Sequence, residues 1–328
     1  MVAQRDPALE SVLHVMDQDW HGIRSATAAL PGGKLAVSHR SPLTADETRL
    51  IFCRIRDGGY RAICFQGYSL VVDRLTEDLQ REFGSGLRLY AVTHVTTSQF
   101  EHHFEMEMLE RIHDRLRAGI IVRAGSVKPD FHHFLPRTWP QCLLNIPPDL
   151  SRLIVALPKR EAGTILIPVE NTWRKNLYTQ VIAAHGSEKV RRICLVSWPT
   201  QLERLMALDK AQLVGFQSLP GLLAHMRLAQ VVANVSFSEC QPMTQLEALA
   251  VGTPTLVGPL RLPGFSSHPL SALCEVSDFD DPGLLRRRFE LVLDEWTRDP
   301  AGLSEMISDF LKLRTAAGLS RYREFLEL

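Results

Sequence analysis

The sequence lacks several motifs that would assign a function class at once. Its six cysteines form no C-x-x-C pair, which argues against a zinc knuckle, a thioredoxin-type redox site or a disulfide scaffold. It contains no G-x-G-x-x-G fingerprint, which counts against a dinucleotide-dependent oxidoreductase. It contains no G-x-S-x-G nucleophile elbow, which counts against a serine hydrolase.

An excess of charge and long apolar runs are also missing. Lys and Arg number 37, as do Asp and Glu, so the formal net charge is zero and nucleic acid is not an expected partner. No apolar run approaches the roughly 18 residues of a membrane span. The early charges Arg5, Asp6 and Glu10 do not fit a signal peptide. We therefore expect a soluble, cytoplasmic protein without a transmembrane segment, and peripheral membrane association stays open.

The length and the patterning predict the fold class. With 328 residues, two domains are the first expectation. Short apolar runs alternate with stretches of helical spacing, which is typical of α/β proteins with parallel sheets. We predict two tandem Rossmann-like, doubly wound domains over residues 1–156 and 157–302, facing each other across a cleft. A helical tail over 303–328 would cross back to the first domain, and Ala156–Gly163 would be the linker.

The individual elements follow from the same patterning. In the first domain the expected strands are Val12–Met16, Leu35–Ser38, Ala62–Phe65, Leu87–Val95, Ile120–Ala124 and Cys142–Ile146, with helices Ile23–Leu30 and Phe100–Arg117. In the second, the expected strands are Thr164–Val169, Arg192–Val196, Ala211–Val214, Val231–Val235 and Thr255–Val257. The expected helices there are Leu177–Ala184, Gln201–Ala207, Pro220–Arg227, Met243–Ala250 and Pro282–Trp296.

The stretch from residue 236 to 254 carries the clearest functional pattern. A strand ends near its start, a loop carries Glu239, and a helix begins after Pro242. The N–H groups of Met243 and Thr244 then lie at the positive end of that helix, in a βα loop where α/β proteins bind phosphates. Glu247, farther along the helix, can accept two hydrogen bonds from a vicinal diol. The alternative is an ordinary Rossmann-like helix with two solvated glutamates.

Here the sequence resembles a known family. Seven residues separate Glu239 from Glu247, and residues 247–254 read Glu-Ala-Leu-Ala-Val-Gly-Thr-Pro. This resembles the donor-binding signature of the retaining GT-B glycosyltransferases. The resemblance implies that Glu247 holds the nucleotide ribose and that Glu239 contacts the donor sugar. The family usually has Gly-Phe-Gly after the first glutamate, where this chain has Cys240-Gln241-Pro242, so the donor sugar is not carried over.

Two cations stand where the first strand of the second domain gives way to a helix. Lys175, followed by Asn176, resembles the lysine that neutralises the donor diphosphate in the family, which has Lys-Asn or Lys-Gly here. The Gly-Arg pair that often precedes it is absent, and Arg174 is the candidate substitute. A cation is needed because the departing nucleoside diphosphate gains negative charge. A solvated Arg-Lys pair at a helix start is the alternative.

The first domain supplies two further candidates by resemblance. His14-Val15-Met16 followed by Gly22 resembles the opening strand and glycine loop of the family, which places Gly22 near the donor. His94 lies at the end of a predicted strand and resembles the histidine that hydrogen-bonds the donor sugar in the family. A buried or capping histidine would explain His94 equally well.

The resemblance implies transfer of a sugar from a nucleoside-diphosphate sugar to a hydroxyl acceptor, with retention of configuration. Glu239, Lys175 and His94 would be the catalytic residues. Arg174, Lys175, Met243, Thr244, Glu247 and Gly22 would bind the donor. The acceptor would be a glycan, a polysaccharide or a lipid-linked saccharide. No metal and no tightly bound cofactor is expected, and UDP- and GDP-sugars are not distinguished.

Four alternatives remain open at this point. A sugar-nucleotide epimerase or hydrolase could share the architecture, and so could a non-catalytic binding subunit. Three histidine-rich groups, around His102, His113 and His132, could suggest a metal site, although exposed helix faces explain them better. Cys240 could be a nucleophile, but no paired base is evident in the sequence.

Overall fold

The computed structural model describes residues 6–133, 137–150 and 157–328. Its strands form two parallel sheets of five strands each, so the predicted α/β class with two doubly wound sheets is confirmed. The chain divides into two compact units. We call Val2–Ile146 with Arg314–Leu328 the N-terminal unit and Pro147–Leu313 the C-terminal unit. The expected linker begins outside the described residues, and residues 157–163 form a loop and turn before the next strand.

The sheet of the N-terminal unit has the strand order β2-β1-β3-β4-β5. The strands are β1 (Val12–Asp17), β2 (Gly33–Val37), β3 (Ala62–Gln66), β4 (Arg88–Thr93) and β5 (Arg123–Ser126), and the long helices are α1 (His21–Ala29), α2 (Ala45–Asp57), α3 (Leu70–Phe83) and α4 (His103–Arg117). Every residue of β1 and β3 is buried, as expected where helices cover both faces of a parallel sheet. The order reverses between β1 and β3, which is the position where such sheets bind ligands.

The sheet of the C-terminal unit has the order β10-β9-β6-β7-β8. The strands are β6 (Thr164–Ile167), β7 (Arg192–Leu195), β8 (Ala211–Leu213), β9 (Val231–Asn234) and β10 (Thr255–Val257), and the helices are α5 (Leu177–His185), α6 (Leu219–Leu228), α7 (Met243–Ala250), α8 (Pro269–Cys274) and α9 (Pro282–Arg298). The central strand β6 pairs in parallel with β7 on one side and β9 on the other. The order therefore reverses between β6 and β9.

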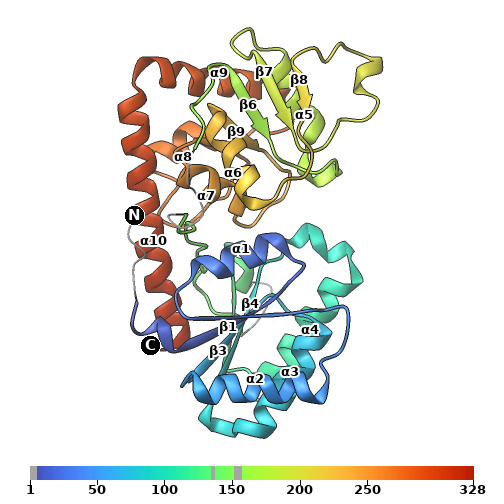
Figure 1. Cartoon of the computed structure of the whole chain (residues 1–328), viewed down its shortest axis with the longest axis vertical. Coiled ribbons are helices and arrows are strands. Elements are labelled where there is room, and N and C mark those ends of the chain that lie inside the picture. Colours follow the sequence, from blue (N-terminus) through green and yellow to red (C-terminus); the bar gives the residue numbers. More distant parts are fainter. Residues whose placement is uncertain (1–5, 134–136, 151–156) are drawn as a thin grey trace. The chain divides into compact units, whose positions relative to one another are not determined.

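The last helix, α10 (Pro300–Leu326), is one unbroken helix (Figure 1). Its residues up to Leu313 belong to the C-terminal unit, and those from Arg314 belong to the N-terminal unit. In the N-terminal unit its end is held by the Tyr90 hydroxyl, which donates to the Leu326 carbonyl at 3.0 Å. Arg123 donates to the Glu324 carbonyl at 2.9 Å. The helix end is thus joined to β4 and β5.

Most expected elements appear within a few residues of their predicted bounds, but two were wrong and three helices were missed. Gln201–Ala207 forms only the 3₁₀ turn Leu202–Arg204. Cys142–Ile146 is not a strand, because the carbonyls of Cys142 and Asn145 accept hydrogen bonds from arginine side chains of α10 instead of from a neighbouring strand. Helices α2, α3 and the short α8 were not predicted.

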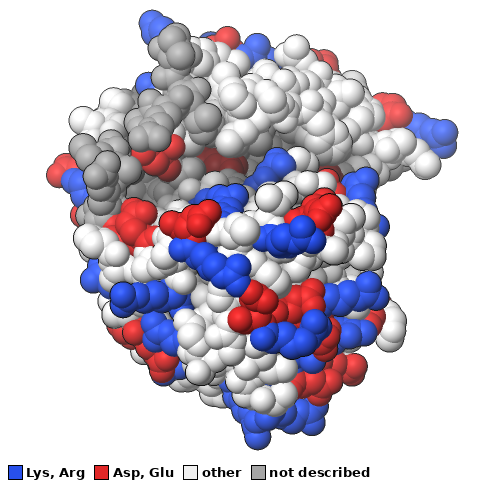
Figure 2. Space-filling model, turned by 60° about the horizontal axis from the view of Figure 1, so that its bottom comes forward, with Lys and Arg blue, Asp and Glu red and all other residues white. Residues whose placement is uncertain are grey.

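The charged side chains on the face shown in Figure 2 alternate in sign. Ion pairs of α2 and α3 include Arg56 with Glu82 and Arg81 with Asp78. These pairs are exposed, so each contributes little to stability. None of the described helices has the length and apolarity needed to cross a membrane.

The close approach of α10 to the segment at residues 144–146 generates the first prediction. A Cβ at Gly318 would lie 2.3 Å from Ile146 Cγ2 and 3.2 Å from the Leu144 carbonyl oxygen. Helix propensity alone would make Gly318→Ala stabilising by about 1 kcal/mol. We expect it to lower the free energy of unfolding by about 1–2 kcal/mol, because overpacking outweighs propensity.

Urea denaturation of the full chain measures this effect. Gly221→Ala in α6 is the control, since the atom nearest its Cβ would be the flexible end of Gln217, at 3.0 Å, and the next two would lie at ordinary contact distances of 3.5 and 3.6 Å. A stabilising Gly318→Ala would show that α10 does not lie this close to the segment.

Candidate functional site

The carboxyl ends of β6 and β9 bring the two predicted donor-binding loops together. Leu166 of β6 is paired with Val232 of β9, so the loops that follow these strands start side by side. The first loop carries Arg174 and Lys175, and the second carries Glu239. In open α/β sheets, ligands bind at such a reversal of strand order.

The loop after β6 ends in a tight turn that explains its sequence. Trp173–Lys175 form a 3₁₀ turn, and Asn176 follows with φ 53° and ψ 38° in the left-handed region. Only glycine and, less often, asparagine or aspartate adopt this conformation at low cost. The buried Asn176 also donates through Nδ2 to the Phe279 carbonyl at 2.7 Å. The residue after Lys175 is therefore restricted by backbone geometry.

Gln180 of α5 joins the two loops, and no local pattern in the sequence predicts this role. Its fully buried side chain donates through Nε2 to the carbonyls of Lys175 (2.8 Å) and Asn176 (3.1 Å). Its Oε1 accepts from the Val235 N–H at 2.9 Å, directly after β9. One amide thus fixes the Lys175 turn against the end of the neighbouring strand.

The two loops meet through Glu239. Its carboxylate forms an ion pair with the Lys175 ammonium, and Arg174 Nη1 lies 3.4 Å from the same carboxylate oxygen. Arg174 also donates to the Ser238 carbonyl at 2.8 Å, and the Phe237 N–H donates to the Arg174 carbonyl at 2.9 Å. Arg174 therefore holds the Glu239 loop by three contacts, and the structure brings Lys175 and Glu239 into direct contact.

Helix α7 begins and ends at the residues predicted for it, Met243 and Ala250. Pro242 precedes it and offers no N–H, and no side-chain cap is found for the first turn among the described residues. The first N–H groups of a helix have no partner within it, so this end carries partial positive charge. Glu247 is 5% exposed, within the second turn. An ordinary Rossmann-like helix was expected to carry a solvated glutamate at this position, and the buried Glu247 does not match that alternative.

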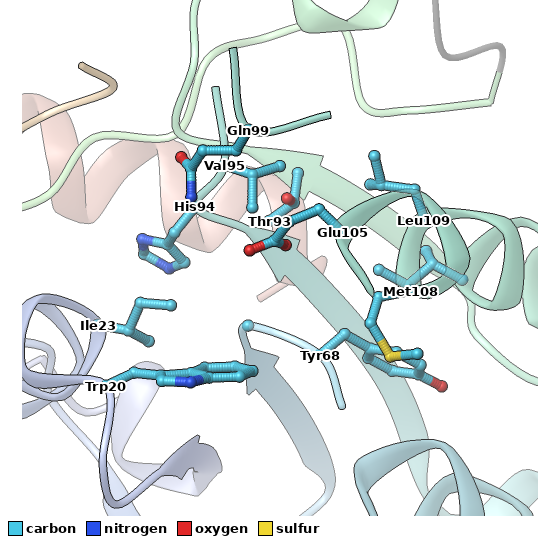
Figure 3. Close-up of a pocket in the computed structure, with 12 residues that line it drawn as sticks. Trp20, Ile23, Tyr68, Thr93, His94, Val95, Gln99, Glu105, Met108 and Leu109 are labelled. Atoms are coloured by element: carbon cyan, nitrogen blue, oxygen red, sulfur yellow. The ribbon is translucent and has the colours of Figure 1, made fainter. Parts of the chain in front are cut away.

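The N-terminal unit has a separate pocket at the carboxyl ends of β1, β3 and β4 (Figure 3). It has a volume of about 170 Å³ and includes His94, whereas Gly22 is not among its lining residues. His94 Nε2 lies 2.9 Å from Gln66 Oε1, and since an amide oxygen only accepts, this nitrogen is the donor. Burial lowers the pKa of His94 to about 4, so the imidazole is neutral at pH 7.

Gln66 is a second residue that sequence reasoning missed. Its Oε1 also lies 3.5 Å from the Tyr322 hydroxyl of α10, and its Nε2 lies 3.3 Å from His14 Nδ1. Burial lowers the pKa of His14 to about 3. The sequence did carry a signal for this contact, since His14 and Gln66 stand in otherwise apolar strands. Buried polar side chains need hydrogen-bond partners, so each predicts another polar group nearby.

Among the described residues, one group of acid and histidine side chains is close enough to share a metal ion. It consists of Asp17, Asp19 and His39. Each of the three has a partner, because His39 Nδ1 hydrogen-bonds the Asp17 carboxylate at 2.9 Å and Arg40 forms an ion pair with Asp19 at 2.8 Å. The histidine-rich groups noted in the sequence do not form such a cluster among these residues. Cys240 is a buried thiol.

Comparison with known proteins assigns the fold. No protein-family model matches the chain, and no curated protein matches it in sequence. A solved structure of Anabaena HepE with UDP is similar, with a TM-score of 0.61 at 12% identity over 97% of this chain and 100% of that one. A Rickettsia africae glycosyltransferase gives 0.58 at 12% identity over 96% and 98%. A Listeria monocytogenes protein described as a UDP-N-acetylglucosamine 2-epimerase gives 0.52 at 12% identity over 90% of each chain. The chain has the GT-B fold of these structures.

The bonds of Gln180 generate the second prediction. Gln180→Leu keeps the size of the side chain but leaves one N–H and two carbonyls without this partner. Each buried unpaired group costs about 1–3 kcal/mol, so we expect a loss of about 2–4 kcal/mol in the free energy of unfolding. Gln212→Leu, on an exposed position of β8, should change stability by less than about 0.5 kcal/mol. Equal effects of the two variants in urea denaturation would contradict the joining role of Gln180.

Proposed function

We propose that the chain is a glycosyltransferase that moves a sugar from a nucleoside-diphosphate sugar to a hydroxyl acceptor, with retention of configuration. The observation that carries the proposal is the contact between Lys175 and Glu239 at the reversal point of the second sheet. The GT-B fold supports it, since solved structures of this fold include a UDP complex. The proposed acceptor is a glycan, a polysaccharide or a lipid-linked saccharide.

Lys175 and Glu239 would exchange partners when the donor binds. In the structure, the carboxylate of Glu239 balances the Lys175 ammonium, and the side chains are only 16% and 21% exposed. A diphosphate offers Lys175 more negative charge than one carboxylate does, and the ammonium has three donor hydrogens. Glu239, held in place by Arg174, would then accept hydrogen bonds from hydroxyls of the donor sugar.

Helix α7 would bind the rest of the nucleotide. The N–H groups of Met243 and Thr244 would donate to phosphate oxygens at the positive end of the helix. Glu247 would accept from the ribose diol. All these hydrogen bonds would be made to the phosphates, the ribose or the sugar, and none to the base. UDP- and GDP-sugars therefore both fit this part of the proposal. The roles predicted for Gly22 and His94 in the N-terminal unit belong to the same proposal.

The reaction would be a displacement on one face of the sugar. The bond from the anomeric carbon to the phosphate oxygen breaks as the acceptor oxygen bonds to the same carbon. The acceptor's proton passes to the departing phosphate. Lys175 and the start of α7 would stabilise the charge that develops on the leaving group, which is the largest contribution such a site makes.

Lys175→Ala provides the third prediction. We expect turnover in sugar transfer to fall about 10²- to 10³-fold, because one stabilising donor is lost as negative charge develops. In calorimetry, UDP and GDP should bind more weakly to this variant, whereas uridine and guanosine should bind as before, since a nucleoside lacks the diphosphate. Lys189→Ala is the matched control, since Lys189 is an exposed lysine of the same unit that pairs with Asp294.

Normal turnover with Lys175→Ala would remove Lys175 from the site. The same assay distinguishes the transferase from the alternative activities. Release of free sugar or of an epimer without any acceptor would favour the hydrolase or epimerase, an activity class that the fold of the Listeria protein keeps open. Failure of the wild type to bind UDP and GDP would favour a non-catalytic protein.

A further inference from the structure

The pocket in the N-terminal unit contains one carboxylate and no opposing cation. Its walls are mostly apolar, and its described lining residues include no lysine and no arginine. Glu105 of α4 is half-buried, and its carboxylate makes no hydrogen bond or ion pair with any described residue. Burial raises the pKa of this carboxyl group, and His102, which does not line the pocket, opposes the rise by a smaller amount. In Figure 3, the Glu105 carboxylate and the His94 imidazole point towards the same space, and the Trp20 indole lies across it.

The Trp20 indole is held rigidly at this pocket. His39 stacks on it with ring centroids 5.5 Å apart and an interplanar angle of 23°, and the buried Asp17 holds His39 through a hydrogen bond to Nδ1 at 2.9 Å. Gly67 has φ 81°, and a Cβ there would lie 2.9 Å from the indole. A fixed aromatic surface beside an acceptor-only carboxylate can bind a ring that has an apolar face and a polar edge.

The size and charge of the pocket limit its ligand further. Its volume of about 170 Å³ lies below the roughly 300–1,000 Å³ of sites for drug-sized ligands, which favours a single ring over an extended oligomer. A negatively charged ligand would face an unpaired carboxylate in apolar surroundings, where repulsion is strong. A hydroxyl or ammonium group would instead supply the hydrogen bond that Glu105 lacks.

We propose that this pocket binds one sugar ring without negative charge, with Glu105 accepting hydrogen bonds from its hydroxyl or ammonium groups and Trp20 covering its apolar face. Glu105 is then the residue that excludes acidic sugars. The assignment of this ring to the acceptor rests on the proposed glycosyltransferase function, whereas its binding does not. Under that function, the transferred sugar goes to a neutral or amino-sugar terminus.

The probes are three sugars of nearly equal size: glucose, N-protonated glucosamine and glucuronate. Each is titrated into the full chain, labelled with ¹⁵N in its tryptophan indoles, and the Trp20 signal is identified by its loss in Trp20→Phe. We expect glucose and glucosamine to shift this signal, glucosamine binding at least as tightly, and glucuronate to bind about tenfold more weakly or not at all. Glu105→Gln should bring the three affinities to within about threefold of one another, because the charge is removed and the shape is kept.

Glu110→Gln is the control, since Glu110 is an exposed residue of the same helix and does not line the pocket. It should keep the wild-type order of affinities. Glucuronate binding as tightly as glucose, an unchanged order in Glu105→Gln, or no shift of the Trp20 signal by any of the three sugars would each overturn the proposal. Titration of the same sample with UDP and GDP separates the two hypotheses. Nucleotide binding without sugar binding would contradict only this inference, and the reverse result would contradict only the proposed function.

Discussion

The buried amide of Gln180 is the constraint on which the candidate donor site depends. It hydrogen-bonds the turn that carries Lys175 and, through its other end, the backbone directly after β9. Two loops from strands that are far apart in sequence are therefore held at fixed spacing before any ligand arrives. With this spacing fixed, the Lys175 ammonium reaches Glu239, and Arg174 reaches the Ser238 carbonyl. Preorganisation of this kind matters because a site that stabilises developing charge loses its advantage when it must rearrange during the reaction.

In the pocket of the N-terminal unit, too, a buried glutamine amide fixes the neighbouring polar groups. Parallel strands β1, β3 and β4 each end in a polar residue or a loop at the same sheet edge, and Gln66 lies at the centre of the polar contacts there. Its amide oxygen fixes the tautomer of His94, whose pKa of about 4 keeps the ring uncharged. The unpaired Glu105 carboxylate is then the charged group that a ligand meets in a pocket whose lining lacks lysine and arginine. The two candidate sites thus differ in their charged groups: Arg174, Lys175 and a helix N-terminus accompany Glu239 in one, and Glu105 is the carboxylate that lines the other without a lysine or arginine beside it.

Much of this architecture could be predicted from the sequence, because buried parallel strands appear as short apolar runs. The bounds of α7 could be predicted because Pro242 precedes the helix and Gly252 follows it. The pattern of Glu239 and Glu247 also led to a fold that the solved structures share.

Other features could not be predicted. Helix α2 was missed although Thr44 and Glu47 form a capping box, because its apolar face is narrow. The segment at Cys142–Ile146 has the composition of a strand, but two of its carbonyls accept hydrogen bonds from arginines that lie 169 and 179 residues later in the chain. Gln66, Gln180 and Glu105 escaped notice because their importance comes from tertiary neighbours, which no local spacing encodes. The roles assigned to individual site residues are predictions still.

A crystal structure of the chain with UDP tests the central claim most directly, because it locates the diphosphate. The account predicts that a phosphate oxygen lies within hydrogen-bond distance of the Lys175 ammonium and of the first N–H groups of α7, with the Lys175–Glu239 ion pair opened and the Gln180 bonds intact. The ribose hydroxyls should meet the Glu247 carboxylate. UDP bound elsewhere, or bound while Lys175 stays paired with Glu239 and away from the phosphates, would contradict it.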